Sequence, residues 1–150
     1  MFTNESHYIA ENFDKYQLHE TCSKLVFDAC TFRNCDFSHA VFKDCQFLDC
    51  RFIECNLSNL QWQGCQFSLT QFSDCKMLGI DWTQVRWLDY VFEEAVAFER
   101  CVLSDNSFFG LTLNDLRLSD CKVHRVDFRE GRFCHADFSG SDFNGSLFGK

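Results

Sequence analysis

The stretch LVFDA CTFRN CDFSH AVFKD CQFLD CRFIE, residues 25–54, repeats with a step of five, and this period determines the fold. Each unit carries one large apolar residue at its centre and a smaller residue two positions earlier. An α-helix repeats its buried face about every 3.6 residues and a strand about every two, so a period of five requires a regular bend in each unit. The stretch therefore predicts a solenoid built from short, bent strands.

The period of five continues through almost all of the remaining chain, giving twenty-five units in total. A single added residue within 93–95 shifts the frame between Phe92 and Phe98. We interpret this one-residue insertion as a β-bulge, with a docking feature as the alternative. The central residues are Phe27, Phe32, Phe37, Phe42, Phe47, Phe52, Leu57, Trp62, Phe67, Phe72, Met77, Trp82, Trp87, Phe92, Phe98, Leu103, Phe108, Leu113, Leu118, Val123, Phe128, Phe133, Phe138, Phe143 and Phe148.

Nine of the 11 cysteines occupy the small position of a unit. Stacked cysteines such as Cys35, Cys55 and Cys75 would lie close enough for a disulfide, but their parallel side-chain directions do not fit its geometry. A structural zinc site is also disfavoured, because its ligands usually lie two to four residues apart. We expect these cysteines to act as small apolar residues in a reducing compartment. Cys134, at an outward position, is expected to be the most reactive.

The units CDFSH (35–39), ADFSG (136–140) and SDFNG (141–145) share a pattern of a small residue, Asp, Phe and then Ser or Asn. This pattern resembles the pentapeptide-repeat family over residues 25–150. The resemblance implies an all-β fold, a right-handed quadrilateral parallel β-helix of about six coils with four units per coil. Residues 1–24 then form a short N-terminal cap, in which Tyr8, Ile9, Phe13 and Leu18 lie over the first coil.

Four units per coil place residues twenty apart above one another, about 4.8 Å away. Trp62 is therefore expected to stack on Trp82. A second column is expected to continue across the insertion, and its members are Phe27, Phe47, Phe67, Trp87, Phe108, Phe128 and Phe148.

The chain is acidic, with 22 Asp and Glu against 14 Lys and Arg and a formal net charge of −8. This balance disfavours direct binding to nucleic acid, which requires clustered cations, and favours a basic partner. With the insertion counted as one residue, Glu54, Asp74, Glu94 and Asp115 are expected on one face. The neighbouring face is expected to carry Asp49, Asp89 and Glu130. A solvated face without a partner is the alternative interpretation of this acidic stripe.

The acidity and the aromatic core are similar to those of quinolone-resistance members of the family. Those proteins are rod-shaped dimers that occupy the DNA-binding saddle of gyrase or topoisomerase IV. The resemblance therefore implies a non-enzymatic DNA mimic that binds a type II topoisomerase, DNA gyrase, and modulates it or protects it from quinolones. The alternative is a generic rigid interaction scaffold with another partner. The chain lacks the long projecting loops and the C-terminal helix of the gyrase-protecting type.

We expect no catalysis, no cofactor and no metal, because the interior is filled with side chains and the five histidines are scattered. At the C-terminal end, Phe133, Phe138, Phe143 and Phe148 have no covering segment, and this predicts a tail-to-tail homodimer. No apolar run approaches the roughly 20 residues of a membrane-spanning helix. The first ten residues do not resemble a signal peptide, so a cytoplasmic location is expected.

Overall fold

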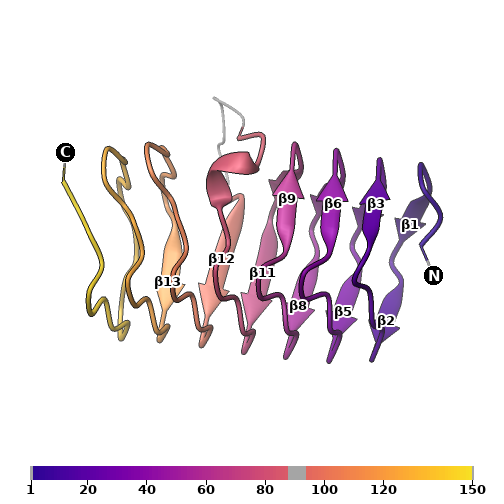
Figure 1. Cartoon of the computed structure of the whole chain (residues 1–150), viewed down its shortest axis with the longest axis horizontal. Helices are drawn as coiled ribbons and strands as arrows, with labels where there is room; N and C mark the ends of the chain where they lie inside the picture. Colours follow the sequence, from indigo (N-terminus) through magenta and orange to yellow (C-terminus); the bar gives the residue numbers. More distant parts are fainter. Residues whose placement is uncertain (1, 88–93, 150) are drawn as a thin grey trace.

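Short parallel strands make up nearly all of the regular structure (Figure 1). The computed structural model describes residues 2–87 and 94–149. The strands are β1 (His7–Ile9), β2 (Asn12–Asp14), β3 (Thr21–Ser23), β4 (Val26–Asp28), β5 (Thr31–Arg33), β6 (Val41–Lys43), β7 (Gln46–Leu48), β8 (Arg51–Ile53), β9 (Gln61–Gln63), β10 (Gln66–Ser68), β11 (Thr70–Ser73), β12 (Val96–Glu99) and β13 (Arg117–Ser119). One 3-10 turn, η1 (Trp82–Gln84), interrupts them.

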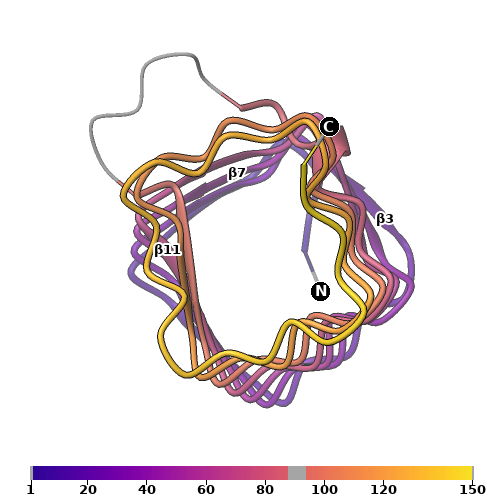
Figure 2. The same cartoon turned by 90° about the vertical axis from the view of Figure 1, so that its left-hand side faces the viewer.

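The strands form three ladders along the axis of the rod, ordered β1-β4-β7-β10, β2-β5-β8-β11-β12-β13 and β3-β6-β9. Paired residues lie twenty apart in most of the chain, for example Phe27 with Phe47 and Phe47 with Phe67. Figure 2 looks along the axis and shows the backbone winding around a central space, which the inward side chains fill. The predicted all-β parallel solenoid is confirmed.

The segment expected as an N-terminal cap contributes strands to the same ladders. β1 pairs with β4, β2 with β5 and β3 with β6, so residues 7–23 form a coil of their own. The offset is 19 residues at Tyr8 and Phe27 and becomes 20 at Cys22 and Phe42. The Phe2 ring packs against the core, edge to face with Tyr8 and Phe13 of this coil at 5.6 and 5.2 Å and with Phe27 of the next coil at 5.1 Å.

The offset between successive coils increases to 26 residues after β11. Phe72 pairs with Phe98, and Asp81 forms a bridge with Ser107. Six additional residues therefore separate these coils, and our expectation of a one-residue insertion at 93–95 requires correction. An insertion of one residue and an insertion of six give the same frame, because they differ by one whole pentapeptide. Every later unit consequently lies one face earlier in the coil than expected, so that Phe98 lies over Phe72 and not over Met77.

The aromatic columns follow this corrected register. Trp82 stacks on Trp62, as predicted, with ring centroids 6.1 Å apart. Phe108 stacks on Trp82 at 5.7 Å, so the predicted continuation of the Phe67 and Trp87 column into Phe108 is wrong. Phe128 follows Phe108 in the same column at 5.3 Å.

Rings of successive coils stack nearly parallel, whereas rings of neighbouring faces meet edge to face. Phe52 lies 4.6 Å from Phe32 and 4.9 Å from Phe72, with interplanar angles of 9° and 10°. The Trp62 ring meets that of Phe67, the next unit of the chain, at 82°. Both arrangements are favourable for aromatic quadrupoles, and each such pair adds about 0.5–1.5 kcal/mol beyond the burial of apolar area.

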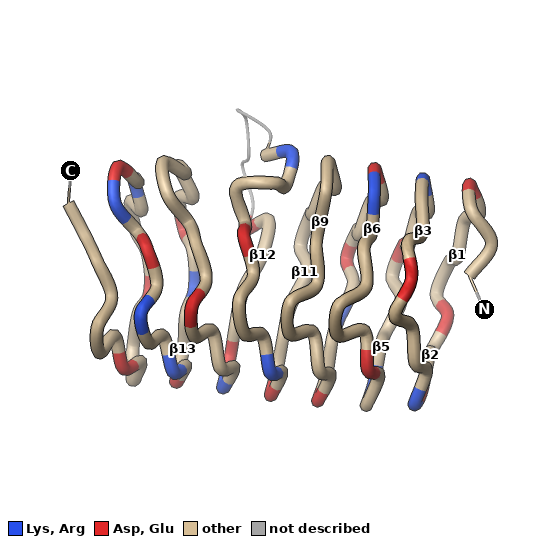
Figure 3. Tube along the Cα trace, in the orientation of Figure 1, with Lys and Arg blue, Asp and Glu red and all other residues tan. Residues whose placement is uncertain are grey.

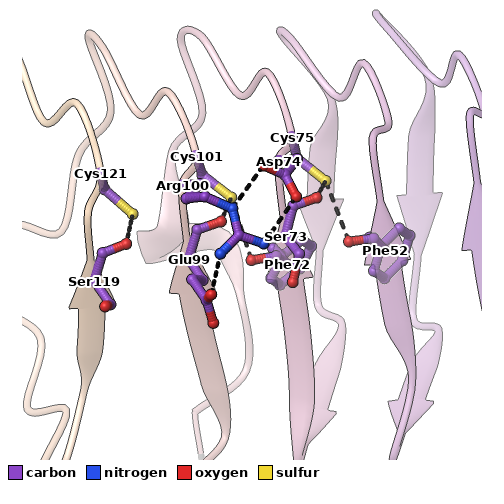
Figure 4. A network of polar contacts seen from close by, with 10 residues as sticks. All are labelled: Phe52, Phe72, Ser73, Asp74, Cys75, Glu99, Arg100, Cys101, Ser119 and Cys121. Atoms are coloured by element: carbon purple, nitrogen blue, oxygen red, sulfur yellow. Dashed lines mark hydrogen bonds and ion pairs between the residues drawn. The ribbon is translucent and has the colours of Figure 1, made fainter.

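The small inner position is a hydrogen-bond donor in much of the rod. The Cys55 thiol donates to the Phe32 carbonyl at 3.3 Å, the Cys75 thiol donates to the Phe52 carbonyl at 3.3 Å, and the Thr70 hydroxyl donates to the Phe47 carbonyl at 3.1 Å. Figure 4 shows Cys75, Cys101 and Cys121 in one column. Burial raises the pKa of Cys50 to about 12, so its thiol stays protonated at neutral pH. Every cysteine is unpaired, and Cys134 is exposed.

The recurring Asp before the central residue closes the corner of the coil. The Asp36 carboxylate accepts the Ser38 N–H at 3.0 Å, and the Asp137 carboxylate accepts the Ser139 N–H at 2.9 Å. This Asx turn satisfies a backbone N–H locally, so it favours a bend over a continued strand at this position. The next residue, His39 or Gly140, then takes a positive φ of 62° or 71°.

Candidate partner-binding surface

The outer positions of the coils carry both signs of charge (Figure 3). Two members of the predicted acidic face, Glu54 and Asp74, occupy the same corner in successive coils. The Glu54 N–H donates to the Ser73 carbonyl and the Asp74 N–H donates to the Glu99 carbonyl, both at 3.0 Å. Because of the 26-residue offset, the next position of this corner holds Arg100. The predicted acidic face is therefore interrupted by a base.

Arg100 binds the carboxylate below it through two nitrogens (Figure 4). Its Nε lies 2.9 Å from Asp74 Oδ1 and its Nη2 lies 3.0 Å from Asp74 Oδ2, and the guanidinium also contacts Glu99. The hydrogen bonds from Arg100 lower the pKa of Asp74 and raise that of Arg100 itself. Asp74 is thus neutralised by its own chain and is poorly placed to attract a basic partner.

Other predicted acidic residues gather at the neighbouring corner. The residues stacked at this corner in successive coils are Asp49, Leu69, Ala95 and Asp115. Their register follows from backbone hydrogen bonds, in which the N–H groups of Asp49, Leu69 and Asp115 donate to the carbonyls of Ser68, Glu94 and Cys134 in the next coil. Glu94 directly precedes Ala95 and so lies beside this column. Asp28, which sequence reasoning missed, occupies the position equivalent to Glu94 in an earlier coil. We call Asp28, Asp49, Glu94 and Asp115 the acidic edge.

The acidic edge is sparsely neutralised. In the described part of the chain, its one ion pair joins Glu94 to Arg117 at 3.8 Å. Exposed apolar side chains lie along the same edge, Ile9 at 68% exposure and Leu69 at 44%. Leu69 also takes a φ of 48°, a region that side chains of its kind seldom occupy. The edge therefore offers carboxylates and an apolar contact together.

The remaining predicted acidic residues do not join this edge. Glu130 lies at another corner, where its N–H donates to the Gly149 carbonyl at 2.7 Å. Asp89 falls outside the described residues. Elsewhere several charges are paired, with Arg125 bound to Asp105 and Arg129 bound to Asp127, each at 2.9 Å.

Among residues 2–87 and 94–149, no group of three or more His, Cys, Asp or Glu side chains is placed to ligate a metal ion. His124 contacts Asp142 at 2.8 Å, without a nucleophile beside it among the contacts of the described chain. Within those same ranges, no helix is both long and apolar enough to span a bilayer.

The four residues predicted to form a dimer interface lie in the last described coil, around the ring of Phe128 from the preceding unit. Phe148 stacks on Phe128 at 4.9 Å and remains 53% exposed, while Phe133 meets the Phe128 ring edge to face at 5.4 Å. Phe138 and Phe143 complete the set, 5.1 Å from each other. A shallow hollow of about 320 Å³ opens beside Phe128, Phe133 and Phe148.

We expect the protein to lose stability in acid. Six aspartates have a lowered pKa in the folded state, because arginine, serine or histidine groups hydrogen-bond their carboxylates: Asp36, Asp74, Asp105, Asp127, Asp137 and Asp142. A lowered folded-state pKa stabilises the fold above the unfolded-state value near 3.8, and this stabilisation disappears as the pH falls through the folded-state pKa.

The urea midpoint should therefore decrease steadily as the pH falls from about 5 to about 2. A midpoint that is the same at both ends of this range would show that the carboxylates do not contribute to stability.

Comparisons with known proteins agree with the fold. A family model described as pentapeptide repeat region matches residues 25–96, and a second, described as pentapeptide repeats (8 copies), matches residues 113–149. No curated protein sequence matches the chain.

Two solved structures of low identity are similar to the chain. A trypsin-treated form of QnrB1, a plasmid-mediated fluoroquinolone resistance protein, is 21% identical over 94% of this chain and 74% of that chain, with a TM-score of 0.40. HetL, a pentapeptide repeat protein involved in heterocyst differentiation regulation from the cyanobacterium Nostoc, is 11% identical over 97% of this chain and 91% of that chain, with a TM-score of 0.41.

Proposed function

The chain belongs to the pentapeptide-repeat family, and we propose that it is a non-enzymatic binding protein whose acidic edge contacts a basic surface of a protein partner. This proposal rests on one observation, the acidic edge, which combines the carboxylates of Asp28, Asp49 and Asp115 with the exposed side chain of Leu69. The interior supports it indirectly, because packed rings and thiols leave only the exterior for function. The unpaired thiols also favour a reducing, cytoplasmic location.

We propose the DNA-binding surface of a type II topoisomerase, DNA gyrase, as the partner surface. Carboxylates on a solenoid edge recur at multiples of about 4.8 Å, and phosphates of one DNA strand recur about every 3.4 Å. A rigid acidic rod therefore offers a basic groove a charge pattern of similar scale. Binding there would compete with DNA, and this competition is how the protein would modulate the enzyme or protect it from quinolones.

A second candidate is a rigid scaffold for a different partner. The ion pairs Arg100–Asp74, Arg125–Asp105 and Arg129–Asp127 favour it, because they neutralise charge outside the acidic edge. A DNA mimic gains from unpaired carboxylates on several faces, whereas a scaffold needs one contact surface and a stiff body. In this case the acidic edge still binds, but gyrase is not its target.

Charge reversal on the acidic edge separates these two functions. The wild-type protein is expected to alter DNA supercoiling by gyrase, and the triple variant Asp28→Lys/Asp49→Lys/Asp115→Lys should bind at least about tenfold more weakly. The matched control is Asp14→Lys/Asp44→Lys/Asp120→Lys, which makes the same change in net charge at exposed positions outside the edge.

The control variant should retain most of the wild-type affinity, because its carboxylates lie away from the contact. Equal losses in the two triple variants would indicate a nonspecific charge effect. No effect of the wild-type protein on gyrase would remove the DNA-mimic function and leave the scaffold.

We also propose that two copies associate through their C-terminal ends. Phe148 and the hollow beside it present apolar surface there, and a two-fold contact would cover both copies at once.

A further inference from the structure

Aliphatic and acidic side chains alternate along the N-terminal half of the acidic edge. On the outer side of the ladder that contains β7 (Figure 2), Ile9 pairs with Asp28 and Asp28 pairs with Leu48. At the adjoining corner, Leu69 lies over Asp49 in the next coil, in the register that their backbone hydrogen bonds define. Each carboxylate is therefore bordered along the rod by a large aliphatic side chain. We call Ile9, Asp28, Leu48, Asp49 and Leu69 the docking patch.

The C-terminal half of the acidic edge has different neighbours. Glu94 is paired with Arg117 at 3.8 Å. The Asp115 N–H donates to the Cys134 carbonyl, so the following residue, His135, lies over Asp115 in the next coil. The two carboxylates of this half thus have a base or a polar side chain beside them, in contrast to those of the docking patch.

The two carboxylates of the docking patch form no ion pair within the described part of the chain. The base nearest to Asp49 in the sequence, Arg51, lies beyond the corner in β8, which belongs to a different ladder. The Ala29 N–H donates to the Leu48 carbonyl, and this register places Asp49 over the residue that follows Asp28. Successive coils are about 4.8 Å apart, so one planar guanidinium can bind both carboxylates.

The stability of the fold does not account for Leu69. Its side chain is exposed and its φ is 48°. Among the described residues, it is the only large apolar residue with a positive φ. The left-handed region is unfavourable for leucine, and an exposed leucine recovers little of this cost by burial. Backbone strain combined with exposed apolar surface therefore indicates a contact with another molecule.

We propose that the partner docks on this patch through an arginine flanked by apolar side chains. The guanidinium binds Asp28 and Asp49, and the flanking side chains pack on Ile9, Leu48 and Leu69. The aliphatic contacts exclude water around the ion pairs and so strengthen them, as in the energetic centres of many protein interfaces. This inference rests on the proposed function in using the acidic edge. It goes further in requiring only two of the four carboxylates and one arginine with apolar neighbours, in place of a row of bases.

Two short peptides of equal charge test the chemistry of the partner. One carries an arginine between two leucines and the other carries an arginine between two serines. In NMR titrations of the full chain, the leucine-flanked peptide should bind at least about tenfold more tightly and should shift the amide signals of β4, β7 and Leu69. Equal affinities would mean that charge alone attracts the partner, and they would overturn the inference. A leucine-flanked peptide that does not bind would overturn it as well.

Neutral substitutions identify the carboxylates that matter. Asp28→Asn/Asp49→Asn should weaken binding of the leucine-flanked peptide by at least about tenfold, because both ion pairs are lost. The matched control Glu94→Gln/Asp115→Asn removes the same charge from the same edge and should stay within about twofold of wild type. Equal losses in the two variants would contradict a contact confined to the docking patch.

Leu69→Asn separates binding from stability. It should weaken binding by about tenfold, since the apolar contact is lost. It should also raise Tm by about 2–4 °C, because asparagine enters the left-handed region more readily than leucine. Leu78→Asn makes the same exchange at an outward position of another face and should bind like wild type. A Leu69→Asn variant with wild-type affinity would overturn the inference.

The peptide titrations do not involve gyrase, so the two proposals can fail separately. If the wild-type protein alters supercoiling and Leu69→Asn alters it equally, the inference fails and the proposed function remains. If the peptides bind as expected and the wild-type protein leaves gyrase unaffected, gyrase is refuted as the partner and the docking patch remains.

Discussion

Replacing Phe52 by Ala is expected to reduce the free energy of unfolding by about 3–5 kcal/mol, as for large core aromatics generally. Phe52 is fully buried and stacks between Phe32 and Phe72 at 4.6 and 4.9 Å. A solenoid coil is held only by the coils above and below it, so a cavity in one layer weakens both interfaces at once. Urea denaturation followed by circular dichroism measures the loss.

Phe109→Ala is the matched control, because it removes the same ring from an outward position that is 46% exposed. There the ring faces the Arg129 guanidinium, 5.7 Å from the ring centroid. The expected cost is about 1 kcal/mol or less. Similar losses in the two variants would mean that the rings of the central series are not stacked inside the rod.

Replacing Asn106 by Leu is expected to destabilise the protein by about 1–3 kcal/mol, although Leu is apolar and the site is buried. The Asn106 Nδ2 donates to the Met77 and Ser104 carbonyls at 2.7 and 3.0 Å, and its Oδ1 accepts the Trp82 indole N–H at 2.8 Å. Leucine would leave the indole N–H without an acceptor in a site where water is excluded. Thermal unfolding and tryptophan fluorescence measure the effect.

A double-mutant cycle with Trp82→Phe tests this interpretation, because phenylalanine removes the N–H and keeps a ring in the column. Asn106→Leu should cost clearly less in the Trp82→Phe background than in the wild type. Ile80 precedes Asn106 in the same inner column, and the Trp62 Nε1 has no hydrogen-bond partner among the described residues. The hydrogen-bond network of Asn106 is therefore local to this coil. If the destabilisations caused by Asn106→Leu and Trp82→Phe simply add in the double variant, the hydrogen bond between the two side chains does not stabilise the protein.

The sequence predicted the fold because its signal is local and repeated. Among the described residues, the central residue of each unit marks an inward position, and the Asp of units such as 35–39 marks the corner. An error in one unit therefore does not affect the assignment of the next. Which face a unit occupies is a different matter. It depends on how many residues the chain inserts between Phe72 and Phe98, and a period of five cannot distinguish one residue from six.

That ambiguity explains why the surface was predicted less well than the core. A shift of the chain by one whole pentapeptide still places one central residue over another, so both registers give a packed core. On the surface the same shift exchanges Glu94 for Arg100 above Asp74 and turns an expected repulsion into an ion pair. Asp28 was missed for a different reason: the predicted acidic residues lie two places after a central residue, and Asp28 lies one place after Phe27.

The inner cysteines were predicted as small apolar residues, and their burial confirms this. Their hydrogen bonds were not predictable from the sequence, since each thiol donates to a carbonyl such as that of Phe32, twenty-three residues earlier in the chain. Only the stacking of coils brings the two groups together.

The central claim is that the chain winds into a solenoid with Phe108 over Trp82 across a 26-residue offset. An isotope-edited NOE spectrum of the aromatic side chains tests it most directly. We expect contacts between the Trp82 indole and the Phe108 ring, and between the Phe108 and Phe128 rings, whose centroids lie 5.7 and 5.3 Å apart. Contacts from Phe108 to Trp87 in place of Trp82 would contradict the register, and a lack of contacts between rings twenty residues apart would contradict the solenoid itself.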